Sequence, residues 1–181
     1  MGTKTKIDWC DATWNPVTGC LHGCKYCYAR NIANRFGGYS LSYADNDGKF
    51  RYIEHERQML AVAESPMSRR DKTGRIISAP YPFSFRPTLH RYRLDEPACW
   101  TRPRNIFVCS MADLFGEWVP DAWIREVFEA CEAALQHRYM FLTKDPKRYA
   151  ELRAKDIQPP ANSWIGTSAT TDTEAKEQTL A

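Results

Sequence analysis

The stretch Thr18-Gly-Cys-Leu-His-Gly-Cys-Lys-Tyr-Cys-Tyr-Ala-Arg30 places three cysteines, Cys20, Cys24 and Cys27, within eight residues. The glycines inside it indicate a loop. Three soft sulfur ligands on one loop favour a metal or cluster site over a disulfide. The C-x3-C-x2-C spacing supplies three thiolates where a closed zinc or iron–sulfur site needs four. One coordination position is therefore left for another ligand.

This spacing, with Tyr26 directly before the third cysteine, resembles the radical S-adenosylmethionine (SAM) superfamily. The resemblance implies that Cys20, Cys24 and Cys27 hold three irons of a [4Fe–4S] cluster and that SAM binds the fourth. It also implies that Tyr26 lies near the adenine of SAM. Two other interpretations stay open: a structural zinc site completed by His22 or a distant cysteine, and a chance cluster of buried cysteines. We expect His22 itself to be a solvent-facing loop residue, with contact to the cluster or SAM as the alternative.

Length and composition predict a single globular domain over residues 1–181, with room for a substantial core. Hydrophobic residues make up 43% of the chain, yet no apolar run approaches the roughly 20 residues that a membrane span requires. The first residues lack the apolar region of a signal peptide. We therefore expect a cytoplasmic protein with no membrane contact. Seven cysteines, an odd number, favour reduced thiols over a disulfide framework.

Apolar patterning predicts four strands, each followed by a helix. The strands are expected over residues 7–17, 105–110, 139–143 and 163–168, and the helices over 28–36, 121–135, 145–154 and 172–181. This alternation implies a parallel sheet with right-handed crossovers. We predict the α/β class: a partial, open (β/α) barrel of about four parallel strands, with a long insertion over residues 37–103 after the first βα unit. Four strands cannot close a barrel.

Two segments carry more detailed expectations. In the helix that begins at Pro120-Asp121, six residues share one face at helical spacing: Ile124, Val127, Phe128, Cys131, Ala134 and Leu135. Within the insertion we expect one helix from Ile53 to about Glu64 and otherwise ordered loop. Arg86 and His90 are polar candidates for facing a substrate, with a surface-loop position as the alternative.

Five further segments resemble an uncharacterised phage-associated family whose members look like radical SAM proteins. The segments are Thr13–Cys20, Cys24–Tyr28, Val108–Phe115, Leu142–Lys144 and Trp164–Ser168. Members of that family continue with further barrel strands, and this sequence departs from them there. We expect either a short form or a partner that completes the sheet, because an open strand edge is normally covered.

The resemblance also implies positions around SAM. Ser110 and Asp113 follow the second strand, where superfamily members contact the methionyl amino group, although the usual Gly-Gly-Glu is missing. Asp113 alternatively caps the following turn. Thr167 and Ser168 end the fourth strand, within reach of the ribose. The cationic candidates for the SAM carboxylate are Lys144 and Arg30.

The leading hypothesis is thus a radical SAM-type enzyme of unknown substrate that depends on a reducing electron donor. Arginines interleaved with aromatic residues between positions 69 and 104 make nucleic acid a candidate partner, while the net charge of +3 neither requires nor excludes one. The alternative is a non-enzymatic phage-encoded binding module whose zinc or iron–sulfur site is structural. We expect the cysteines at the C-terminal edge of the parallel sheet beside Ser110, Thr143 and Ser168, with the insertion over the mouth.

Overall fold

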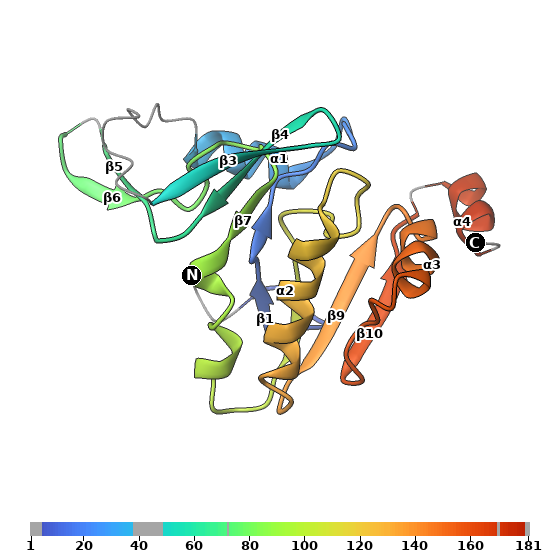
Figure 1. Ribbon diagram of the computed structural model, residues 1–181. Helices are drawn as coiled ribbons and strands as arrows, with labels where there is room; N and C mark the ends of the chain where they lie inside the picture. Colours follow the sequence, from blue (N-terminus) through green and yellow to red (C-terminus); the bar gives the residue numbers. More distant parts are fainter. Residues whose placement is uncertain (1–4, 38–48, 72, 170, 180–181) are drawn as a thin grey trace.

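The computed structural model describes residues 5–37, 49–71, 73–169 and 171–179, so part of the predicted insertion and the end of the last predicted helix lie outside the described residues. Its main sheet, sheet A, has four parallel strands in chain order (Figure 1). They are β1 (Ala12–Trp14), β8 (Asn105–Val108), β9 (Arg138–Thr143) and β10 (Ser163–Thr167). The described strands close no barrel. The predicted α/β class with an open parallel sheet is confirmed.

A helix follows each strand of sheet A, as the alternating pattern predicts. The helices are α1 (Tyr28–Phe36), α2 (Asp121–Glu132), α3 (Lys147–Ala154) and α4 (Asp172–Thr179). α1 ends at Phe36, as expected for the helix over residues 28–36, with Gly37 as its C-cap, and α2 starts directly after Pro120, which has no amide hydrogen to leave unpaired. None of the helices in the described ranges combines the length and apolar composition needed to cross a bilayer.

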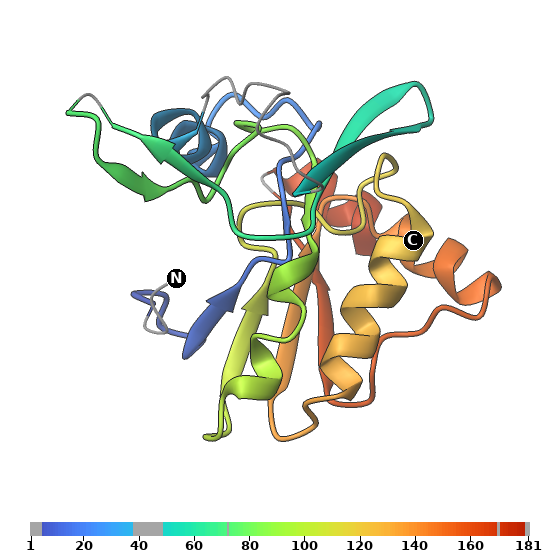
Figure 2. The ribbon, with the colours of Figure 1, turned by 60° about the vertical axis from the view of Figure 1, so that its left-hand side comes forward.

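The core lies between sheet A and α2, which crosses one face of the sheet (Figures 1 and 2). Alternate strand residues point into it and are almost fully buried: Trp14, Ile106, Val108, Tyr139 and Phe141. The predicted face of α2 meets them, but Leu135 is 68% exposed. Its assignment to the buried face is wrong, because α2 ends at Glu132 and Leu135 lies in the turn that follows.

The opposite face of sheet A is less covered. Phe107, Met140 and Leu142 are only partly buried there. At the edge of the sheet, β10 leaves Trp164 69% and Ile165 49% exposed. The expectation that a partner completes the sheet stays a prediction.

The predicted first strand is divided in two at Asn15-Pro16. Residues beyond the proline form β2 (Val17–Thr18), which belongs to a second sheet, sheet B, in the order β2, β7, β4, β3. The other strands are β7 (Thr88–His90), β4 (Gln58–Ala63) and β3 (Phe50–His55). The insertion also forms the small hairpin β5 (Ser68–Arg70) and β6 (Ile76–Ser78) and two short 3-10 helices, η2 (Arg91–Arg93) and η3 (Pro97–Cys99).

The helix predicted from Ile53 to Glu64 is wrong, because this segment is the β3–β4 hairpin. Both faces of β4 are covered, because Leu60 and Val62 pack in the main core and Ala63 packs in a second apolar cluster. Its apolar run Leu60–Ala63 is therefore buried without alternation. A short, fully buried strand cannot be distinguished from a buried helix by periodicity alone.

Candidate functional site

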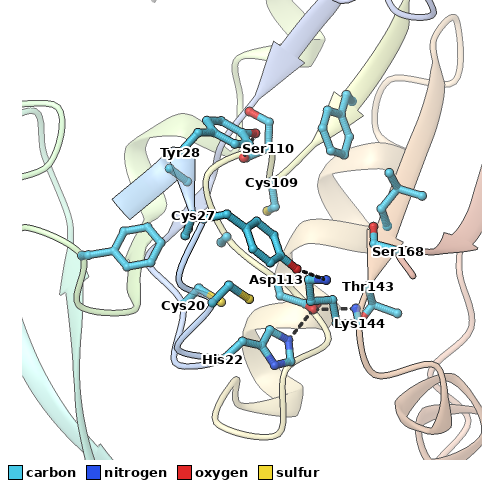
Figure 3. A pocket seen from close by; sticks show the side chains of 17 residues that line it. Cys20, His22, Cys27, Tyr28, Cys109, Ser110, Asp113, Thr143, Lys144 and Ser168 are labelled. Atoms are coloured by element: carbon cyan, nitrogen blue, oxygen red, sulfur yellow. Dashed lines mark hydrogen bonds and ion pairs between the residues drawn. The ribbon is translucent and has the colours of Figure 1, made fainter. Parts of the chain in front are cut away.

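A cavity of about 210 Å³ lies at the C-terminal edge of sheet A, on the side that α2 leaves open. Its lining includes the three motif cysteines, His22, Tyr26, Tyr28, Phe85, Cys109, Ser110, Asp113, Thr143, Lys144 and Ser168 (Figure 3). The prediction that the cysteines share one site with Ser110, Thr143 and Ser168 is confirmed. Of the residues predicted to bind a cofactor, Thr167 is not among those that line the cavity.

The cysteine loop is fixed to the end of β8 by its backbone. The amide of Gly19 donates to the carbonyl of Met111 at 3.0 Å. Gly19 has a φ of +86°, and a Cβ at this position would clash with the backbone carbonyl of Arg86. Only glycine fits here. At the other end of the loop Cys27 caps α1, because its Sγ accepts a hydrogen bond from the amide of Arg30 at 3.4 Å.

The motif thiols are free and partly accessible from the cavity. Burial raises the pKa of Cys20 to about 11, so the thiol is neutral at physiological pH in the protein alone. A coordinated metal ion reverses this balance, since a coordinating thiol loses its proton. Within the described ranges, no three or more His, Cys, Asp or Glu side chains form a group that could hold a metal ion. The match to a metal or cluster therefore rests on residue type, three soft sulfur ligands on one loop, and not on a preformed geometry.

Asp113 connects three segments that surround the cavity. One carboxylate oxygen accepts hydrogen bonds from His22 Nε2 at 2.7 Å and from the amide of Lys144 at 2.9 Å (Figure 3). The other accepts from the amide of Phe115 at 3.1 Å. The last bond confirms the alternative that Asp113 caps its own turn. The carboxylate is 8% exposed and already has three donors.

The interpretation of His22 as a solvent-facing residue is wrong. Its side chain is 22% exposed, and its ring packs edge-on against Trp118 with 4.8 Å between the centroids. Nothing in the local sequence indicates this position, because its partner Asp113 lies 91 residues away. The pairing depends on sheet A bringing the end of β8 beside the cysteine loop.

Ser110 is held by Asn15, a second residue whose role the sequence did not indicate. Asn15 is 2% exposed, and its Oδ1 accepts from Ser110 Oγ at 3.1 Å and from the amide of Met111 at 2.9 Å. The preceding Cys109 has a φ of +57°, which turns the chain sharply at the end of β8. Tyr28 Oη then donates to the carbonyl of Ser110 at 2.6 Å. This wall of the cavity is thereby tied to α1.

Lys144 faces the cysteine loop from the end of β9. Its Nζ donates to Tyr26 Oη at 3.2 Å and lies 5.7 Å from the ring centroid (Figure 3). Burial lowers the pKa of Lys144, but the bond to Tyr26 and nearby negative charge outweigh it and raise the pKa above its usual value. The cavity therefore has a fixed positive charge beside the motif thiols.

The insertion contributes Phe85 to the cavity but neither of its two polar candidates. His90 is fully buried, with Nε2 2.8 Å from Thr18 Oγ1. Arg86 lies over the ring of Tyr52, 5.2 Å from its centroid. Arg86 is exposed, which fits the surface-loop alternative, whereas His90 is buried in β7 and fits neither interpretation. Arg30, a candidate for the SAM carboxylate, lies over the ring of Phe85 at 5.5 Å.

The family model described as "Protein of unknown function (DUF5131)" matches residues 4–180, which is nearly the whole chain. No curated protein and no solved structure matches the chain. The protein therefore belongs to the DUF5131 family of proteins of unknown function.

Proposed function

We propose that the protein is a radical SAM-type enzyme that binds a [4Fe–4S] cluster through Cys20, Cys24 and Cys27. The observation that carries this proposal is that three thiols from one loop open into the same cavity as Ser110, Lys144 and Ser168. These polar groups come from the C-terminal ends of neighbouring parallel strands, which is where α/β sheets and barrels bind their ligands. When bound, such a cluster supplies the electron that breaks the C–S bond of SAM.

The residues of the chain bind and orient SAM in this proposal. The ammonium of Lys144 attracts the carboxylate of the methionyl group. Tyr26 offers an exposed ring against which adenine can stack. Ser110 and Ser168, which both line the cavity, are the acceptors and donors for the amino group and the ribose. Asp113 keeps these walls together rather than presenting a free carboxylate.

The proposal is tested first by metal content. Protein purified without oxygen should contain about four irons and no stoichiometric zinc, with the charge-transfer absorption of an iron–sulfur cluster. Alanine in place of any motif cysteine should abolish the iron. Cys99→Ala is the matched control, because Cys99 is an exposed cysteine outside the cavity. One tightly held zinc would instead favour the non-enzymatic binding module.

The second test is SAM cleavage. Reduced, iron-loaded protein should release 5′-deoxyadenosine and methionine slowly without a substrate. Lys144→Met should raise the Kd for SAM about tenfold with an unchanged iron count, since it removes one charge-assisted contact. Lys144→Arg, which keeps the charge, should recover part of the affinity. An intact cluster that shows no SAM-dependent spectral change and no 5′-deoxyadenosine would contradict the proposal.

A further inference from the structure

An exposed apolar stripe runs along α1 away from the cavity. Tyr28, Ile32 and Phe36, spaced four residues apart on one helix face, are 56%, 37% and 44% exposed. We call them the α1 stripe. Ala29 and Ala33 are the residues of α1 that pack inward. Tyr28 belongs to both features, because it also lines the cavity. The stripe is therefore continuous with the proposed active site.

The charged residues in α1 and in the neighbouring sequence are all positive. Residues 12–44 contain no aspartate or glutamate, and their charged residues are Lys25, Arg30 and Arg35. Lys25 and Arg35 are exposed, and Arg35 is one position before Phe36, with its guanidinium 5.4 Å from that ring. Exposed aromatic rings flanked by cations suit a flexible polyanion that carries planar groups.

Several of the later arginines, by contrast, are occupied in protein contacts. Arg91 pairs with Glu64 at 3.0 Å and with Glu126 at 2.8 Å. Arg93 is buried, and Arg104 lies over the ring of Trp100. The arginine-rich sequence between 86 and 104 is thus largely structural. The β5–β6 hairpin, whose Arg70 is exposed, extends next to α1 in both views (Figures 1 and 2).

We infer that single-stranded nucleic acid binds along the α1 stripe, with phosphates at Lys25 and Arg35 and bases stacked on Tyr28 and Phe36. A single strand is favoured over a duplex, because a duplex keeps its base faces inside its own stack. The strand leads into the cavity past Tyr28, which makes a nucleotide the substrate class. That last statement rests on the proposed function; the binding surface does not.

The experiment is fluorescence anisotropy of the full chain with labelled 12-nucleotide DNA and RNA, a duplex, and an abasic strand. Binding should weaken with salt. Lys25→Gln/Arg35→Gln should reduce the slope of log K against log salt by about 1.4, because each phosphate contact on a single strand contributes about 0.7. Arg102→Gln/Arg138→Gln removes the same charge from exposed positions at the opposite end of sheet A and should leave the slope unchanged.

Stacking is tested separately from charge. Phe36→Leu keeps an apolar side chain but removes the ring, and it should weaken binding by at least about fivefold. The abasic strand should bind the wild type more weakly by a similar factor. Equal affinity for abasic and normal strands, or equal slopes for the two double variants, would overturn the inference. Self-association through the stripe without oligonucleotide binding would also overturn it.

The two proposals fail in different ways. Oligonucleotide binding is measured without SAM, and 5′-deoxyadenosine release is measured without oligonucleotide. If the protein cleaves SAM but does not bind single-stranded oligonucleotides, this inference is overturned and the proposed function is supported. A protein that binds single strands with the expected salt and stacking dependence but never cleaves SAM supports the binding surface. It contradicts the proposed function and, with it, the assignment of a nucleotide as substrate.

Discussion

The carboxylate of Asp113 joins three separate pieces of the site at one residue. It binds His22 in the cysteine loop, Phe115 in its own turn and Lys144 at the end of β9. Each donor comes from a different segment, so the residue fixes the distance between the motif thiols and the strand ends. Its contribution to the site is therefore one of positioning.

Asp113→Ala should lower the free energy of unfolding by about 2–4 kcal/mol, because it leaves two backbone amides and an imidazole without their buried acceptor. Urea unfolding measures this. Asp95→Ala removes an exposed carboxylate and should change stability by less than about 0.5 kcal/mol. Wild-type stability for Asp113→Ala would show that the three hydrogen bonds do not hold the loops.

His90 makes stability depend on pH. Its side chain contacts Thr18 and Tyr92, and burial together with the charge of Arg93 holds the pKa of His90 well below 6.5. Above pH 6.5 the folded and unfolded chains both keep it neutral. Below pH 6.5 only the unfolded chain takes up the proton, so this contribution to stability is lost as the pH falls.

Between pH 7.5 and 5.5 this loss should be about 1.4 kcal/mol of unfolding free energy. The measurement is urea unfolding at both values for the wild type and for His90→Gln, which removes the titration and keeps a polar partner for Thr18. Subtracting the pH dependence of the unfolding free energy of His90→Gln from that of the wild type gives the contribution of His90 without that of the other histidines. Parallel curves for the two proteins would contradict the prediction.

At the scale of elements, the turn of the β3–β4 hairpin has an unfavourable sequence for its shape. Glu56 and Arg57 lie between the paired residues His55 and Gln58, and both have positive φ, at 46° and 63°. A two-residue loop of this kind favours Asn-Gly. Residues with a Cβ lose roughly 1–2 kcal/mol in the left-handed region.

Glu56→Asn/Arg57→Gly should therefore raise the free energy of unfolding by about 1 kcal/mol. Chemical denaturation followed by circular dichroism measures the gain. Glu56→Ala/Arg57→Ala is the matched control: it removes the same charges but keeps both Cβ atoms, so no gain is expected. If the two double variants were equally stable, the turn would carry no strain.

At the scale of the whole molecule, the two sheets are joined where the chain leaves β1 for β2. Arg93 stabilises this junction from the inside. Its guanidinium donates to the carbonyls of Asn15 at 2.9 Å and Pro80 at 3.1 Å, while its own carbonyl accepts from Trp14 Nε1 at 2.8 Å. One buried side chain thus ties sheet A to the insertion.

Arg93→Met should lower the free energy of unfolding by about 3 kcal/mol, since one buried and one partly buried carbonyl lose their donor. Arg93→Lys should recover only part of this, because a single ammonium does not reproduce the planar fork. Thermal and urea unfolding measure both. Arg102→Met, at an exposed position, serves as the control and should be close to wild type. Full recovery by lysine would mean that charge alone matters.

The sequence by itself determined the parallel sheet, its helices and the group of cysteines. These follow from local features: apolar periodicity in α2, the glycine after α1, and three cysteines close together in the chain. Because parallel strands end at one edge, strand assignment was enough to place Ser110 and Ser168 in one site.

Only the tertiary structure decided the second sheet and the partners inside the site. Burial of β4 on both sides removed the alternation that identifies a strand, so the hairpin was taken for a helix. His22, Asn15 and Arg93 became structural residues through contacts with groups 78 to 95 positions away. Such pairings depend on which segments the folded sheets bring together, and that information is not local in the chain.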